Sequence, residues 1–213
     1  MVEHHPDDHA PRPAEGRGPA PDPRIGALEA QLEALRDHVA HLELQLEVLS
    51  ATDPLTGLAN RSGMADHVEQ ALHRLERTGE PFAVMSVGIQ VLDDVLAEYG
   101  ELAHSAAVAH VSALLAAGLR AVDRVGRTEP GAFIVGLAEL TADRAYVVER
   151  RVRTLLGAVP LEAVDGSGER ELEARIGLVA VAGKLALGAG DVIAMAEEAR
   201  RAATLERAAV VSL

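Results

Sequence analysis

Hydrophobic residues recur at alternating steps of three and four between residues 25 and 50, which places them at the a and d positions of a heptad repeat. Leucine stands at every d position and two a residues are β-branched, a pattern that favours a parallel two-stranded coiled coil. The alternative, one amphipathic helix packed on its own domain, would show a wider apolar face. The pattern therefore predicts a homodimer through Ile25, Leu28, Leu32, Leu35, Val39, Leu42, Leu46 and Leu49.

Beyond residue 50 the pattern alternates between helical and strand-like segments as far as residue 213. Apolar periodicity predicts helices over Arg61–Thr78, Val91–Glu98, Ala103–Leu119, Thr141–Leu156 and Ala189–Leu205. Apolar runs predict strands over Phe82–Ile89, Val122–Arg127, Ala132–Ala138, Leu161–Val164, Leu172–Ala182 and Ala208–Ser212. Because helices and strands interleave around an antiparallel hairpin, we expect an α+β domain with a mixed sheet over residues 51–213.

The hairpin between the second and third expected strands is closed by Glu129, Pro130, Gly131 and Ala132. Proline presets φ at the second position of a turn, and glycine accepts the positive φ that a type II turn requires at the third. These residues therefore predict a type II turn.

Residues 1–24 hold six prolines and two glycines among scattered charges. This composition cannot bury apolar surface, so we expect a disordered tail that is available to a protein partner. The tail contains His4, His5 and His9, which we interpret as solvated side chains because no scaffold holds them together. We predict no metal and no other cofactor.

Composition limits the partners of the chain. Its formal net charge is −13 and it has one lysine among 213 residues, so the surface repels phosphate backbones and we expect no nucleic-acid partner. The absence of cysteine excludes disulfides, zinc–thiolate sites and thiol catalysis. No run of 18 apolar residues and no apolar leader occur, so we expect no membrane span and a cytoplasmic location.

Two segments carry recognisable motifs, DPLTGLANR at Asp53–Arg61 and DRVGRTEPGAFIVGL at Asp123–Leu137. Together they resemble the GGDEF domain family, the diguanylate cyclases. The first segment matches the motif with which that domain begins. The second segment aligns without a gap to the family's pattern of Asp, apolar strand, Arg, hairpin, Phe and apolar strand. The resemblance runs from Asp53 to the C-terminus and implies the family's fold, a mixed sheet flanked by helices.

The resemblance also implies that the catalytic metal ligands are missing. In the family, the hairpin reads Gly-Gly-Asp/Glu-Glu-Phe, and bound metal ions neutralise the charge that develops during phosphoryl transfer. Here Gly88 and Gln90 stand where the first strand of the family ends in two aspartates, and Gly131 and Ala132 replace the hairpin carboxylates. We therefore expect a degenerate diguanylate cyclase that is not an enzyme.

The nucleotide-binding positions of the family are vacated in the same way. Its guanine-reading Asn and Asp fall on Leu96 and Ser105, and its late phosphate-binding Lys falls on Ala203, although Arg207 remains. Several losses at once favour a folded pseudoenzyme over a single error of alignment.

One polar motif of the family persists. The residues Arg120-Ala121-Val122-Asp123 match the Arg-x-x-Asp motif at which family members bind their product, cyclic di-GMP. A guanidinium donates to guanine O6 and N7 or to phosphate, and a carboxylate accepts from the guanine N1 and N2 hydrogens. A second arginine from a neighbouring helix falls on Arg151, with Arg150 beside it.

A structural role is the alternative for each of these residues. Asp123 is typical of a turn or cap before a strand, and Arg150 or Arg153 can pair with Asp143 or Glu149 along a solvated helix. Two hypotheses follow from the sequence. The chain is a cyclic di-GMP receptor, or it is a ligand-free scaffold that dimerises or docks on a partner.

Overall fold

The computed structural model describes residues 23–49, 51–163, 166, 168–183, 186–205 and 207–213. The chain divides into two compact units, Met1–Glu43 and Leu44–Leu213, and each is described by itself. The expected disordered tail lies outside the described residues except for Pro23 and Arg24, which the structure places at the start of a helix.

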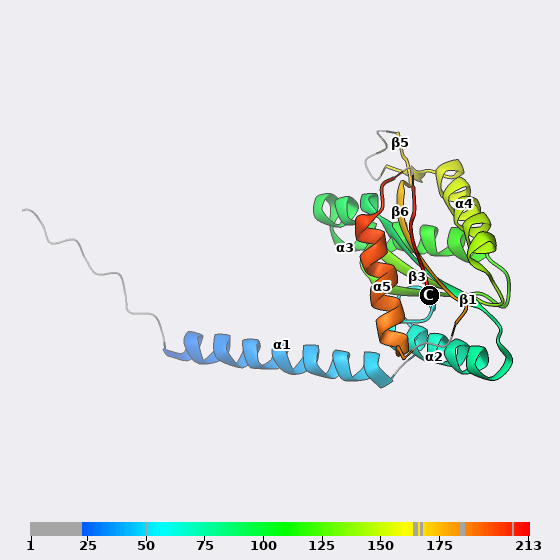
Figure 1. Cartoon of the computed structure of the whole chain (residues 1–213). Coiled ribbons are helices and arrows are strands. Elements are labelled where there is room, and N and C mark those ends of the chain that lie inside the picture. The colour runs from blue at the N-terminus through cyan, green and yellow to red at the C-terminus, as the bar shows by residue number, and fades with distance from the viewer. Residues whose placement is uncertain (1–22, 50, 164–165, 167, 184–185, 206) are drawn as a thin grey trace, which may run out of the picture. The chain divides into compact units, whose positions relative to one another are not determined.

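The helix α1 (Pro23–Leu49) is continuous over 27 residues (Figure 1). It begins at a proline, whose fixed φ and missing N–H suit the first position of a helix. The described side chains of the heptad seam, Leu28, Leu32, Leu35 and Val39, are 45–59% exposed. A narrow row of exposed apolar side chains is the surface that a coiled coil would bury, and dimerisation remains a prediction. Among the described residues, no helix has both the length and the apolar character needed to span a membrane.

A five-stranded mixed sheet forms the centre of the second unit, in the order β2-β3-β1-β6-β7. Neighbouring strands are antiparallel except for β6 and β7, which are parallel. The central strand β1 is an uninterrupted apolar run apart from Ser86 and Gly88, and all eight of its residues are buried. The strands of this sheet are β1 (Phe82–Ile89), β2 (Arg124–Glu129), β3 (Ala132–Leu137), β6 (Ala174–Val181) and β7 (Ala209–Ser212).

Helices cover both faces of this sheet (Figure 1). Alternate residues of β1 point to opposite faces, as in any strand. On one face, Met85 and its neighbours pack with residues of α3 and α4; on the other, Val84 packs with residues of α2 and α5. The expected α+β sandwich with a mixed sheet is confirmed. The four helices are α2 (Arg61–Thr78), α3 (Gln90–Gly118), α4 (Ala142–Ala158) and α5 (Ala189–Ala202).

The helix α3 contains the two helices that were predicted over Val91–Glu98 and Ala103–Leu119. They meet at a kink at Gly100, where φ is 77° and ψ is −174° and the backbone is not helical. Glycine adopts this conformation without steric cost, so the chain leaves and re-enters the helix within one residue. Arg170 lies beside the kink, with its guanidinium 5.4 Å from the Tyr99 ring centroid and 2.6 Å from a Glu98 carboxylate oxygen.

The tip of the β2–β3 hairpin corrects the predicted type II turn. Glu129 pairs with Ala132 across Pro130 and Gly131, but Gly131 is not among the glycines with positive φ. The carbonyl of Gly131 accepts a hydrogen bond from the Ile89 N–H at 2.9 Å. The end of β1 therefore fixes the orientation of this peptide.

Several other boundaries differ by a few residues. The second strand starts at Arg124 instead of Val122, because the Asp123 N–H donates to the Arg120 carbonyl in a turn. The expected strand after α4 is reduced to β4 (Leu161–Glu162), which pairs with β5 (Glu169–Arg170) outside the main sheet.

An ion pair on α4 settles one alternative left open by the sequence. Arg153 lies 2.7 Å from a carboxylate oxygen of Glu149, whose side chain is only 6% exposed. The Arg153 guanidinium also donates to the carbonyls of Ala174 and Leu205. Arg153 therefore anchors the helix to β6 and to the segment after α5, and it is not a free cation of the surface.

Replacing Arg153 with alanine should lower the free energy of unfolding by about 3 kcal/mol, because the buried Glu149 carboxylate loses its charged partner. Urea unfolding followed by circular dichroism measures the change. Arg144→Ala, at an exposed position of the same helix, is the control and should change stability by less than about 0.5 kcal/mol. Equal effects of the two substitutions would contradict the anchoring role.

Replacing Leu35 with aspartate should convert a dimer into a monomer, because it places an unpaired charge in the apolar seam. Sedimentation velocity at tens of micromolar protein measures the change in mass. Ala34→Asp, one residue away and outside the seam, should leave the dimer intact. A wild type that is already monomeric would contradict the coiled coil.

Candidate functional site

The Arg-x-x-Asp residues form a closed ion pair in the turn between α3 and β2. The Asp123 carboxylate accepts from the Arg120 backbone N–H at 3.0 Å, from its Nε at 3.3 Å and from its Nη2 at 3.1 Å. Nη2 also donates to the carbonyl of Ala138 at 2.9 Å. The Asp123 side chain is 1% exposed and that of Arg120 is 48% exposed. The guanidinium thus covers the carboxylate and presents its own outer edge to solvent.

Sequence reasoning identified these two residues but not their pairing. From the spacing in the sequence, the Arg120 guanidinium and the Asp123 carboxylate were predicted as two separate groups, each free to contact a ligand. In the structure, the tight turn brings them onto each other, so Asp123 has the structural role that was its alternative reading. Nη1 of Arg120 makes no hydrogen bond within the described part of the chain.

The second arginine lies on the other side of the end of α3. Arg120 and Asp123 line a shallow cavity of about 280 Å³ that also touches Ala116. Arg151 and Gly118 line a second cavity of about 380 Å³. The last turn of α3 forms a wall of each of the two cavities. The structure therefore brings Arg151 to the neighbourhood of the pair without direct contact. Arg150 is exposed and lines neither cavity.

A separate cleft collects three of the vacated positions. Gly88 at the end of β1 pairs with Ala132 at the start of β3, and Gly131 is adjacent in the hairpin turn. These residues line a cleft of about 290 Å³ together with Asp93 and Arg200. The other vacated positions, Leu96, Ser105 and Ala203, do not line it.

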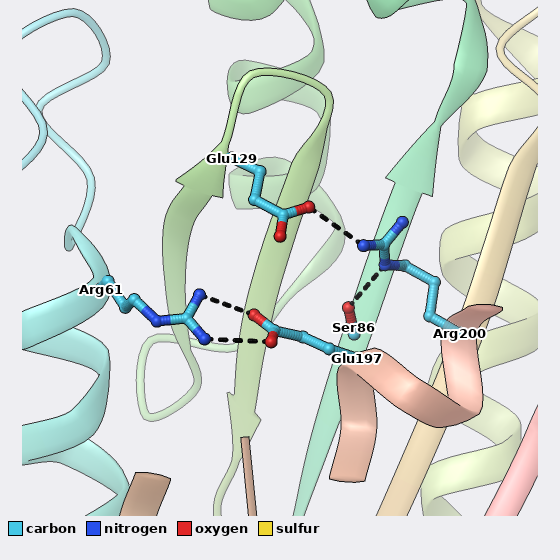
Figure 2. A network of polar contacts seen from close by, with 5 residues as sticks. All are labelled: Arg61, Ser86, Glu129, Glu197 and Arg200. Atoms are coloured by element: carbon cyan, nitrogen blue, oxygen red, sulfur yellow. Dashed lines mark hydrogen bonds and ion pairs between the residues drawn. The ribbon is translucent and has the colours of Figure 1, made fainter. Parts of the chain in front are cut away.

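The most buried cation of this cleft, Arg200 of α5, was missed by the sequence analysis. Its Nε donates to the Ser86 hydroxyl at 3.1 Å and its Nη2 to a Glu129 carboxylate oxygen at 3.1 Å (Figure 2). The side chain is 17% exposed. A signal was present in the sequence, because Arg200 follows Ala196 by four residues and therefore lies on the apolar face of its helix.

A second ion pair lies beside it. Arg61 of α2 donates to both carboxylate oxygens of Glu197, at 2.8 and 3.0 Å (Figure 2). The hydrogen bond to Glu197 raises the pKa of Arg61 above its ordinary value. Glu197 is buried and belongs to the same helix as Arg200, so the two pairs tie α5 to α2, to β1 and to the hairpin.

Comparisons with known proteins match the same part of the chain. The family model described as diguanylate cyclase, GGDEF domain, matches residues 50–208. The diguanylate cyclase DgcP of Pseudomonas aeruginosa is 28% identical over 137 residues, which are 64% of this chain and 20% of DgcP. The bifunctional diguanylate cyclase/cyclic di-GMP phosphodiesterase MucR of the same organism is 29% identical over 129 residues, 60% of this chain and 19% of MucR. The chain spans about a fifth of the length of these relatives.

Solved structures share the fold. The coiled coil and GGDEF domain of DgcB from Caulobacter crescentus, in complex with c-di-GMP, has a TM-score of 0.64 at 19% identity and covers 89% of this chain and 97% of that one. The diguanylate cyclase SiaD of Pseudomonas aeruginosa, in complex with its activator SiaC, has a TM-score of 0.66 at 19% identity and covers 89% and 72%. The family match extends over most of the chain and agrees with the fold, so this protein belongs to the GGDEF domain family.

Proposed function

We propose that this protein is a catalytically inactive member of its family that acts as a cyclic di-GMP receptor. The ligand site consists of Arg120 and Asp123, with Arg151 and Arg150 of α4 completing it. The observation that carries the proposal is the Arg120–Asp123 pair, a half-exposed guanidinium over a covered carboxylate, both lining one shallow cavity.

The chemistry of guanine matches this pair. The Watson–Crick edge of guanine offers N–H donors, as the Arg120 guanidinium does, and its O6 and N7 are acceptors, as the Asp123 carboxylate is. The donors of guanine can therefore replace Arg120 as the partner of Asp123, and its acceptors can replace Asp123 as the partner of Arg120. Because Arg120 covers Asp123 in the free protein, binding requires the guanidinium to move aside and the internal hydrogen bonds to be exchanged for hydrogen bonds to the ligand. The complex of DgcB with c-di-GMP supports this class of ligand.

The arginines on both sides of the end of α3 suit the charge of the ligand. Cyclic di-GMP carries two phosphates, and a guanidinium binds phosphate through parallel N–H donors. Arg151 is exposed and makes no ion pair within the described residues, so its charge is available.

The cleft at the vacated positions supports the absence of catalysis, because its residues do not fit a divalent metal ion. Mg²⁺ needs oxygen ligands at about 2.0–2.1 Å, and Gly88, Gly131 and Ala132 have no side-chain oxygen. Three carboxylates line the cleft, those of Asp93, Glu129 and Glu173, and that of Glu129 is bonded to Arg200. Within the described residues, no group of three or more histidine, aspartate or glutamate side chains is arranged to hold a metal ion.

A ligand-free scaffold is the second candidate function, and one observation favours it. The Arg120–Asp123 pair satisfies itself and Ala138 without any ligand, as a purely structural pair would. In this account, α1 supplies a homodimer and the domain docks on a protein partner in the cytoplasm.

The first prediction of the proposal is the absence of synthesis. Full-length protein incubated with GTP and either Mg²⁺ or Mn²⁺ should form no cyclic di-GMP above a protein-free blank, because the cleft does not ligate the metal. Chromatographic detection of the product measures it. Sustained turnover that scales with protein concentration would contradict the assignment as a pseudoenzyme.

The second prediction concerns Arg120. Isothermal titration should detect cyclic di-GMP binding to the wild type and none to Arg120→Ala, since the loss of a bidentate contact costs about 1–3 kcal/mol per guanine. Arg151→Ala should weaken binding. The Arg120 substitution should also lower the free energy of unfolding by about 1 kcal/mol, because Asp123 loses two hydrogen bonds.

Arg207→Ala is the matched control, because it removes an arginine at a nucleotide-binding position of the family and should leave the affinity unchanged. GTP serves as the comparison ligand. If the wild type fails to bind cyclic di-GMP at a hundred micromolar while remaining dimeric, the scaffold is the better account.

A further inference from the structure

We infer that Arg200 is a resident cation that takes the place of the divalent metal in the cleft and excludes metal from it. The proposed loss of catalysis follows from missing metal ligands. The space in the cleft is also taken, so that restoring a carboxylate is not sufficient to restore a metal site.

The position of the Arg200 guanidinium carries the first step. A Cβ atom at Gly88 would lie 2.6 Å from Arg200 Nη1, 3.0 Å from its Cδ and 3.3 Å from its Cζ. The side chain of any larger residue at position 88 would therefore meet the guanidinium before it could reach into the cleft. The glycine and the arginine are complementary in shape, and a metal ligated from position 88 would collide with Arg200.

The hydrogen bonds of Arg200 carry the second step. Its guanidinium is held by the Ser86 hydroxyl, which is buried in β1, and by the Glu129 carboxylate of the hairpin. The Glu129 carboxylate thus already has its counter-ion (Figure 2). A divalent cation would have to compete for it with the positive charge of Arg200.

Backbone packing carries the third step, because it fixes the position of the Arg200 backbone against the sheet. A Cβ atom at Gly177 of β6 would lie 2.1 Å from the backbone nitrogen of Arg200 and 2.3 Å from the Ala196 carbonyl oxygen. The last turns of α5 therefore rest directly on the sheet at a glycine. This contact fixes the origin of the side chain, and the hydrogen bonds to Ser86 and Glu129 place its guanidinium over Gly88.

Removal of Arg200 should uncover a usable set of ligands. Asp93 lies against the hairpin, with an oxygen 2.6 Å from the position of a Cβ at Gly131, and Glu129 lines the same cleft. Once Glu129 is released, a carboxylate introduced at position 88 would complete three carboxylates around one space. Carboxylate oxygens are the ligands that Mg²⁺ and Mn²⁺ prefer.

The experiment is a titration of full-length variants with Mn²⁺ followed by electron paramagnetic resonance, which reports free Mn²⁺. Gly88→Asp alone should bind Mn²⁺ no better than the wild type. Gly88→Asp combined with Arg200→Leu should gain one site per chain and bind at least about tenfold more tightly. The histidines of residues 1–24 are common to all variants, so the difference between variants reports the cleft.

Three further variants keep the test decisive. Gly88→Asp with Arg201→Leu removes a neighbouring arginine that lines the cleft without an ion pair in the described structure, and it should behave like Gly88→Asp alone. Gly88→Asp with Arg200→Lys keeps the positive charge and should also remain without metal. Arg200→Gln removes the charge but retains a hydrogen-bond donor for Ser86, so in the Gly88→Asp background it should give the metal site even where the leucine variant does not fold.

Two outcomes would overturn the inference. Gly88→Asp with Arg200 intact could bind Mn²⁺ as tightly as the double variants, which would mean that Arg200 excludes nothing. Alternatively, folded double variants with Arg200→Leu or Arg200→Gln could bind no better than Gly88→Asp, which would mean that the space holds no site. Neither outcome depends on cyclic di-GMP binding, so the receptor proposal and this inference stand or fall separately.

Discussion

The central strand β1 is the constraint on which the rest of the second unit depends. All eight of its residues are buried, it lies between β3 and β6, and helices pack on both of its faces. Its C-terminal end meets the hairpin through the Ile89 N–H and the Gly131 carbonyl. The cleft therefore has a rigid floor whatever side chains line it, and a change of chemistry there need not disturb the fold.

The two polar sites of the domain share one physical feature, an arginine that neutralises a carboxylate of its own chain. At the cleft, Arg200 is mostly buried and its partner Glu129 is 44% exposed. At the turn after α3, the burial is reversed: the aspartate is covered and the arginine is half-exposed. A half-exposed guanidinium over a covered carboxylate can exchange its partner for a ligand, whereas the mostly buried Arg200 guanidinium would give up its hydrogen bonds to Ser86 and Glu129 if it moved. This difference is the reason for assigning a ligand to Arg120 and none to Arg200.

Much of the fold was predictable because local patterns determine it. The bounds of α2 and β1 match the expected ones, since an 18-residue amphipathic segment and an uninterrupted apolar run leave few alternatives. The φ of Gly131 was not predictable from the turn residues alone, because the Gly131 carbonyl is bonded to the N–H of Ile89, which is distant in sequence. Long-range contacts decide such details after the elements have formed.

The candidate site also has a part that the local sequence predicts and a part that depends on contacts between distant segments. The spacing of Arg120 and Asp123 identified them, but only the turn geometry pairs one with the other. Arg200 escaped notice because its role needs three elements at once, namely β1 with Ser86, the hairpin with Glu129, and β6 with Gly177 beneath the helix.

The most direct test of the receptor account is nuclear magnetic resonance of the arginine Nε–Hε groups during titration with cyclic di-GMP. The Nε of Arg120 donates to Asp123 and that of Arg200 donates to Ser86, so each reports one site. The account predicts a saturable shift of the Arg120 signal, assigned by its loss in Arg120→Ala, with the Arg200 signal unchanged. An Arg120 signal that stays in place at saturating ligand, or a shift confined to Arg200, would contradict it.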